Sequence, residues 1–135
     1  MRDIRLKTTQ EYSNNIIKSL VGVPYDLYDC WGIVKMFYEL HGIELPEYYE
    51  TPPNDSSISA QYISEAKSDY QKVEGLPEYG DIVLIKVLGL VSHCGVYVGN
   101  GLLLHTRDKI NCTLESLKRH KPRIAGIYRF VNDKT

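Results

Sequence analysis

Three residues have the types that thiol chemistry requires: Cys30, His93 and His105. A cysteine becomes a strong nucleophile as its thiolate, and a nearby imidazole can take the thiol proton to form a thiolate–imidazolium pair. A third polar group then holds that imidazole in the correct tautomer. The sequence therefore contains the parts of a cysteine nucleophile, a general base and an orienting residue.

The position of Cys30 favours reactivity, because the pattern predicts a helix that begins there. Asp29 is a good N-cap, apolar residues follow at helical spacing to about His41, and Gly42 is a natural stop. The unsatisfied N–H groups of a helix N-terminus stabilise a thiolate, and the N–H of Cys30 could face a developing oxyanion. The charge of Asp29 opposes this effect unless its carboxylate is engaged in capping.

The rest of the first half is also expected to be helical. Thr8 and Glu11 match a capping box for a helix that carries Tyr12, Ile16 and Leu20 at spacings of four. After the Pro- and Ser-rich stretch at 46–57, a weaker third helix is expected over about 56–66.

The second half changes to a strand period. Strands are expected over 82–85, 91–98, 102–106 and 124–131. Asn100–Gly101 is a strong signal for a hairpin turn. Helices followed by an antiparallel meander indicate the α+β class, with N-terminal helices packed on a C-terminal antiparallel sheet. The chain length corresponds to a single domain over residues 1–135.

The hairpin determines whether the two histidines can meet. If Asn100 and Gly101 alone form the turn, Gly99 faces Leu102, and alternation then puts His93 and His105 on opposite faces of adjacent strands. A bulge or a wider loop near Gly99 would reverse this.

Other interpretations of these residues remain open. A lone helical cysteine is often a small buried hydrophobe, and a histidine in a strand is often a hydrogen-bonded core residue. Cys94 and Cys112 are interpreted as structural thiols. Zinc could take Cys30, His93, Cys94 and His105, although no Cys-x-x-Cys pair is present and adjacent strand residues point apart.

Composition excludes several classes of protein. The net charge is -1, and the basic cluster at 118–123 is interpreted as a solvated loop, so no nucleic-acid partner is expected. The longest apolar stretch, Ile82–Val91, is too short to span a membrane. Three cysteines form no disulfide framework, and no signal peptide is recognised, so synthesis in the cytoplasm is expected.

The order of motifs is the more specific signal. They run in the order Tyr25, Tyr28–Val34 (YDCWGIV), Tyr79–Val83 (YGDIV), His93–Gly101 (HCGVYVGNG) and Leu104–His105. This set resembles the NlpC-type family of papain-like cysteine peptidases, which act on cell-wall peptides, over roughly residues 10 to 130.

The resemblance implies a role for each matched residue. Cys30 would be the nucleophile, His93 the general base and His105 the residue that orients the base. Tyr25 would lie beside the nucleophile and help to bind the oxyanion. Gly80–Asp81 would be the structural turn that opens the sheet. No metal or cofactor is implied.

The chain also departs from the common pattern of the family. A serine usually follows the nucleophile, and here Trp31 does. In members that cleave between D-glutamate and diaminopimelate, that serine and the preceding aspartate bind the free amine of the stem peptide. Asp29 and Trp31 are therefore the expected substrate-binding residues. Asp29–Cys30–Trp31 stands at the start of the predicted helix and Phe37–Tyr38 near its end. This combination looks more like the branch of the family found in tail-assembly proteins of tailed phages. In such a phage, the virion could carry the enzyme to the cell wall.

The sequence thus leads to three expectations of function. The first is a cysteine peptidase that hydrolyses peptidoglycan stem peptides by a Cys30–His93–His105 mechanism, in association with phage tail-tip proteins. The second is a structural tail component whose cleft serves only for docking. The third is an acyltransferase that resolves the same thioester with an amine or an alcohol.

Overall fold

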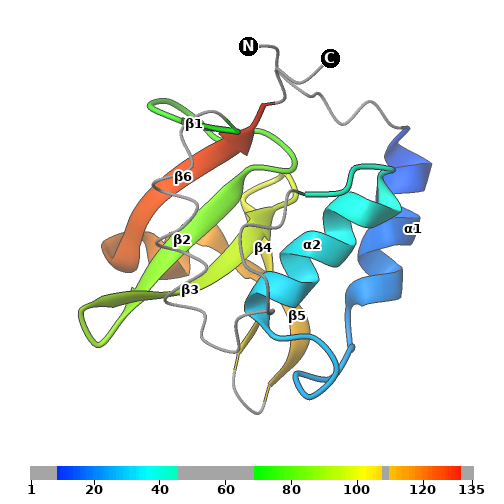
Figure 1. Ribbon diagram of the computed structural model, residues 1–135, viewed down its shortest axis with the longest axis horizontal. Helices are drawn as coiled ribbons and strands as arrows, with labels where there is room; N and C mark the ends of the chain where they lie inside the picture. Colours follow the sequence, from blue (N-terminus) through cyan, green and yellow to red (C-terminus); the bar gives the residue numbers. More distant parts are fainter. Residues whose placement is uncertain (1–8, 46–68, 108–109, 132–135) are drawn as a thin grey trace.

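The structure is a computed structural model that describes residues 9–45, 69–107 and 110–131. The helix expected over 56–66 lies outside the described residues, as does Thr8. Two α-helices, a sheet and a 3-10 helix make up the described part of the chain (Figure 1).

The first helix, α1 (Gln10–Leu20), begins one residue later than the sequence pattern predicted. Its N-cap is Thr9, whose hydroxyl accepts a hydrogen bond from the backbone N–H of Tyr12 at 3.1 Å. Thr9 is therefore the N-cap, and the capping box expected between Thr8 and Glu11 involves a residue outside the described ranges. Ile16 and Leu20 are buried, as the spacing predicted, but Tyr12, which has the same spacing, is 50% exposed.

The second helix, α2 (Cys30–Leu40), has the predicted bounds. The carboxylate of Asp29 caps it by accepting from the backbone N–H of Gly32 at 2.8 Å. After the last turn, Gly42 adopts a φ of 83°, a conformation that glycine reaches without steric cost. The apolar face of α2 is nearly all buried and lies against the sheet.

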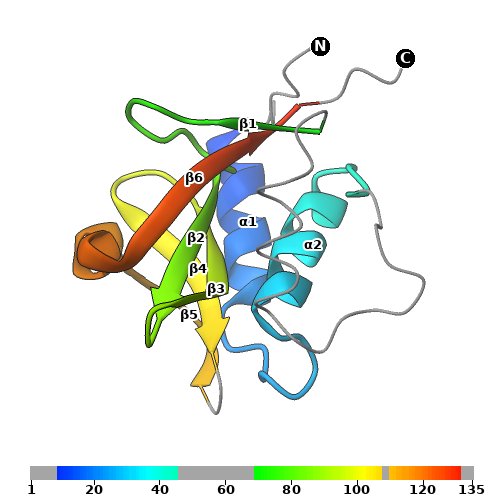
Figure 2. The ribbon, with the colours of Figure 1, turned by 60° about the vertical axis from the view of Figure 1, so that its left-hand side comes forward.

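The described strands form one antiparallel sheet in the order β1-β6-β2-β3-β4-β5. Figures 1 and 2 show α1 and α2 on one face of this sheet and the 3-10 helix η1 at the other. The strands are β1 (Tyr70–Lys72), β2 (Ile82–Val87), β3 (Leu90–Tyr97), β4 (Leu102–Arg107), β5 (Ile110–Ser116) and β6 (Ile124–Phe130), and η1 is Leu117–Arg123.

The β3–β4 turn corrects the expected register. Tyr97 pairs with Leu103 and Val96 with Leu104, so Gly99 does not face Leu102. The turn is one residue wider than the Asn-Gly pair, with positive φ at Gly99, Asn100 and Gly101. A shift of one residue in the register moves every side chain of a strand to the other face of the sheet. His93 and His105 consequently lie on the same face of the sheet, contrary to the simple two-residue turn.

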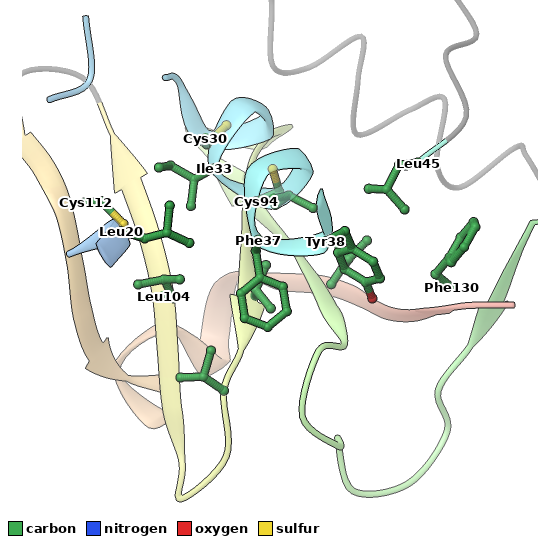
Figure 3. Packing of buried hydrophobic residues seen from close by; sticks show 14 of the residues in the cluster. Leu20, Cys30, Ile33, Phe37, Tyr38, Leu45, Cys94, Leu104, Cys112 and Phe130 are labelled. Atoms are coloured by element: carbon green, nitrogen blue, oxygen red, sulfur yellow. The ribbon is translucent and has the colours of Figure 1, made fainter. Parts of the chain in front are cut away.

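The core is divided between the two faces of the sheet. The larger cluster lies under the helices and includes Ile33, Phe37, Cys94 and Leu104 (Figure 3). The smaller cluster, on the other face, is formed by Val83, Ile85 and Leu103. Alternation along β3 therefore sends Cys94 toward α2 and His93 toward the side of η1.

Three described elements were not predicted from the sequence: β1, β5 and η1. The basic stretch at 118–123, interpreted as a solvated loop, forms most of η1. Its lysines and arginines are exposed, but His120 is buried with 4% of its surface accessible. None of the helices in the described ranges has the length and apolar character needed to cross a membrane.

Candidate active site

A cleft of about 530 Å³ lies at the end of the β2–β3 hairpin. Tyr25 and Cys30 line it from the helix side of the sheet, and His120 and Arg123 from the side of η1. The remaining lining residues are Ile85, Lys86, Val87, Leu88, Ser92 and His93. The fold thus brings together three of the predicted site residues, Cys30, His93 and Tyr25.

Cys30 is the first residue of α2 and has 2% of its surface exposed. The sulfur therefore lies beside the partial positive charge of the helix N-terminus, which stabilises a thiolate. The neighbouring Asp29 is occupied as the cap, and burial raises the pKa of its carboxyl while the Gly32 N–H works against that effect. Capping does not remove the charge of Asp29 from the site, because the charge of Cys30 also raises the pKa of the Asp29 carboxyl and the two groups therefore oppose each other.

The thiol of Cys94 contacts Cys30. Its thiol is hydrogen-bonded to Cys30, and this bond together with complete burial holds the pKa of Cys94 well above its ordinary value. Figure 3 shows both thiols beside the first turns of α2. Cys94 therefore keeps its proton when Cys30 loses its own, and can donate that proton to a Cys30 thiolate.

The two histidines are in direct contact. Nε2 of His93 lies 2.8 Å from Nδ1 of His105. His93 has 8% of its surface exposed and reaches the cleft, whereas His105 has 1% and lies behind it. This is the order expected of a base and the residue that orients it.

Gly95 makes the position of His105 possible. A Cβ at residue 95 would lie 2.9 Å from Cβ of His105, and equally close to the side chain of Leu103 and the backbone oxygen of Leu104. Contacts this short do not occur between real carbon atoms, so any larger residue must displace β4. Gly95 was not singled out in the sequence analysis, although it stands inside the quoted motif.

Gly95→Ala is expected to lower the free energy of unfolding by about 1–3 kcal/mol, because overpacking in a buried sheet costs this much. Any reaction at the cleft that depends on the placement of His105 should also slow at least about tenfold, because a displacement of about 1 Å in a reacting group costs up to a hundredfold. Urea unfolding and the rate of that reaction measure the two effects. Gly75→Ala is the control, since an added Cβ there meets nothing within 4 Å. Wild-type stability in the Gly95 variant would contradict the prediction.

Two further residues adjoin the histidine pair and were missed from the sequence. Nε2 of His105 lies 2.5 Å from Oε1 of Glu115, and Nε2 of His120 lies 3.0 Å from the same oxygen. Burial and the neighbouring His93 lower the pKa of His105 to about 4 in spite of its bond to Glu115. Burial on its own would raise the pKa of Glu115, but the hydrogen bonds from His105 and His120 lower it to about 2. Near neutral pH, Glu115 is therefore an anion and His105 a neutral imidazole.

His105, Glu115 and His120 also form a group that could hold a metal ion, with one ligand atom each inside 4.8 Å. Zinc bonds of about 2.0–2.1 Å in a tetrahedral site would separate two ligand atoms by about 3.3 Å. The 2.5 Å between Nε2 of His105 and Oε1 of Glu115 is too short for two ligands of one zinc ion, and these atoms are joined by a short hydrogen bond instead. His105, Glu115 and His120 are therefore joined by hydrogen bonds and not by a metal ion. The alternative zinc set of Cys30, His93, Cys94 and His105 fits no better, because His93 and Cys94 point to opposite faces of the sheet.

The structure does not bring Asp29 or Trp31 into the lining of the cleft. The Asp29 carboxylate is the helix cap, and Trp31 packs partly against the larger core cluster. Their role in binding substrate stays a prediction.

The sequence profile of the NlpC/P60 family matches residues 18–129. The chain belongs to the NlpC/P60 family. Within the matched range lie Cys30, His93 and His105, and also Glu115 and His120. The expected family resemblance is confirmed.

Two curated relatives are similar over part of the chain. Each is a "Probable endopeptidase p60", one from Listeria innocua and one from Listeria monocytogenes, and each is 31% identical over 81 residues. The match takes in 60% of this chain but only 15% and 14% of the respective relatives. The chain thus corresponds to a small part of these larger proteins.

Solved structures of NlpC/P60 proteins share the fold. An NlpC/P60 family protein from Bacillus cereus superimposes with a TM-score of 0.64 at 22% identity, over 93% of this chain and 41% of that one. The P60 domain of an antigen from Mycobacterium avium subspecies paratuberculosis gives 0.59 at 18% identity, over 88% and 91%. The peptidoglycan hydrolase RipB from Mycobacterium tuberculosis gives 0.54 at 22% identity, over 90% and 62%. The papain-like α+β fold expected from the sequence is confirmed.

Proposed function

We propose that this NlpC/P60 domain is a cysteine peptidase that hydrolyses peptide bonds in peptidoglycan stem peptides. One observation carries the proposal: a nucleophile at a helix N-terminus and an imidazole backed by a second imidazole line the same open cleft. These are the nucleophile, base and orienting group of covalent catalysis.

The steps follow from these positions. The Cys30 thiolate attacks the carbonyl carbon of the peptide bond, and the oxyanion forms beside the backbone N–H of Cys30 and the hydroxyl of Tyr25. His93, which received the thiol proton, gives it to the leaving amine as the carbon–nitrogen bond breaks. A water molecule then loses a proton to His93 and hydrolyses the thioester, which returns Cys30 to its starting state.

The charge of the cleft supports an acidic peptide as substrate. Lys86 and Arg123 line it, and no aspartate or glutamate is among the described lining residues. Stem peptides that contain D-glutamate and diaminopimelate carry free carboxylates, which such a wall attracts. The named activities of the relatives, endopeptidase and peptidoglycan hydrolase, point to the same class of substrate. The phage-tail setting rests on the Asp29–Cys30–Trp31 resemblance alone and stays a prediction.

The test is hydrolysis of purified muropeptides by the wild-type protein and by Cys30→Ala. Mass spectrometry should show peptide fragments with the wild type and no fragments above background with the variant. Equal release by both proteins would end the proposal. If added amines appear in the product in place of water, the protein is the acyltransferase considered above. If the wild type is inert and its Cys30 also resists alkylation below the ordinary thiol pKa of about 8.5, the cleft serves docking.

A further inference from the structure

We propose that Glu115 is a positioning residue of this site, which sets the proton on His105 and, through it, the tautomer of the base His93. The inference rests on the proposed function and extends the Cys30–His93–His105 arrangement by one carboxylate. It is drawn from the hydrogen-bond partners along β3, β4, β5 and η1.

The hydrogen bond between His105 on β4 and Glu115 on β5 determines the tautomer of His105. An ionised carboxylate can only accept hydrogen bonds. Since Oε1 of Glu115 lies 2.5 Å from Nε2 of His105, that nitrogen must carry the N–H. A neutral imidazole has one N–H, so Nδ1 of His105 has a lone pair and accepts.

The tautomer of His105 determines the tautomer of His93. Nδ1 of His105 lies 2.8 Å from Nε2 of His93, so Nε2 of His93 must donate. Nδ1 of His93 is then the ring nitrogen left to take a proton from Cys30 and to pass one to the leaving group. Without the carboxylate, His105 could carry its proton on Nδ1 and force the opposite tautomer on His93.

Glu115 is itself held in place by a neighbouring side chain. The buried His120 holds it, because Oε1 also accepts from Nε2 of His120 at 3.0 Å. Arg119 reaches only Oε2, at 3.1 Å, and its side chain is 70% exposed, so this surface pair contributes little to the position of Glu115. Register puts Glu115 opposite Leu103 and His105 opposite Thr113, so both side chains lie on the same face of β4 and β5. His105 and His120 are buried and Glu115 nearly so, with 16% of its side chain exposed.

The arrangement also stabilises the activated pair. When His93 becomes an imidazolium, its positive charge lies one ring away from the Glu115 anion. Lys86 and Arg123, from β2 and η1, supply fixed positive charge to the same cleft and favour the Cys30 thiolate. Loss of the Glu115 charge should therefore raise the pH at which Cys30 becomes reactive, while these two cations stay unchanged.

The decisive variant is Glu115→Gln, with Arg119→Ala as its matched control. Arg119→Ala removes a partner of Oε2 whose side chain is 70% exposed and leaves Oε1 untouched. Glu115→Gln is expected to lower kcat by about 10- to 100-fold, the cost known for removing carboxylates that orient metal-binding histidines in the same way, with KM within about twofold. It should raise the alkylation midpoint of Cys30 by about one pH unit. Arg119→Ala should change neither value by more than about twofold or 0.2 units.

Alkylation with iodoacetamide, followed at the Cys30 peptide by mass spectrometry, requires no substrate. It therefore separates this inference from the proposed function. A shifted midpoint in a protein that leaves muropeptides intact supports the Glu115 role and removes the proposed function. A wild-type midpoint and kcat in folded Glu115→Gln overturn the Glu115 role and leave the proposed function standing.

Nitrogen-15 NMR of the imidazoles in the wild-type protein gives a second test that does not depend on the folding of a variant. His105 is expected as the Nε2–H tautomer at neutral pH, and His93 is expected to carry a proton on Nε2. A proton on Nδ1 of His105 would overturn the assignment.

Discussion

His93→Ala is expected to lower kcat by about 10³- to 10⁴-fold, because in the proposed mechanism His93 both accepts the Cys30 proton and protonates the leaving amine. His93 lines the cleft with Cys30, and its other ring nitrogen is held by His105. Thiol reactivity should change as well, since a Cys30 without its imidazolium partner titrates at a higher pH. Steady-state hydrolysis and the pH profile of alkylation measure the two effects.

His41→Ala is the matched control for this variant. His41 follows α2, contacts the backbone oxygen of Phe37 and the hydroxyl of Tyr79, and is absent from the described lining of the cleft. Its removal should lower stability but leave kcat within about twofold in the folded protein. A His93 variant that kept more than a tenth of the wild-type kcat would contradict the assignment of His93 as base.

Asp81→Ala is expected to lower the free energy of unfolding by about 3 kcal/mol. The Asp81 carboxylate is buried, with 1% of the residue exposed, and it accepts two hydrogen bonds of 2.9 Å from the guanidinium of Arg129. It also accepts from the backbone N–H of Glu78 at 2.7 Å. Removing one partner of a buried pair leaves the other charge uncompensated, which costs about 3–5 kcal/mol, and the partial exposure of Arg129 places this pair at the lower end. Urea unfolding measures the change.

Glu78 provides the comparison for Asp81. Its carboxylate pairs with the same Arg129 nitrogen at 3.0 Å, but its side chain is 54% exposed. Exposed ion pairs contribute about 0–1 kcal/mol, so Glu78→Ala should cost much less than Asp81→Ala. Equal effects of the two substitutions would show that burial of the Asp81 pair does not control its contribution.

The local parts of the site could be predicted from the sequence alone. Asp29 as a cap and apolar residues at helical spacing determined that Cys30 begins α2, because capping and amphipathic period depend on neighbours within a few residues. Strand periods around His93 and His105 were equally local. The order of these motifs was also enough to predict the family and the fold.

Only the tertiary structure determined which side chains meet. One extra residue in the turn at 99–101 places His93 and His105 on the same face, and a local pattern that fits two turn lengths does not choose between them. Glu115 and His120 join the histidines from β5 and η1, two elements whose sequences gave no signal. Their positions depend on strand pairing and burial between distant segments, and those interactions exist only when the sheet has formed.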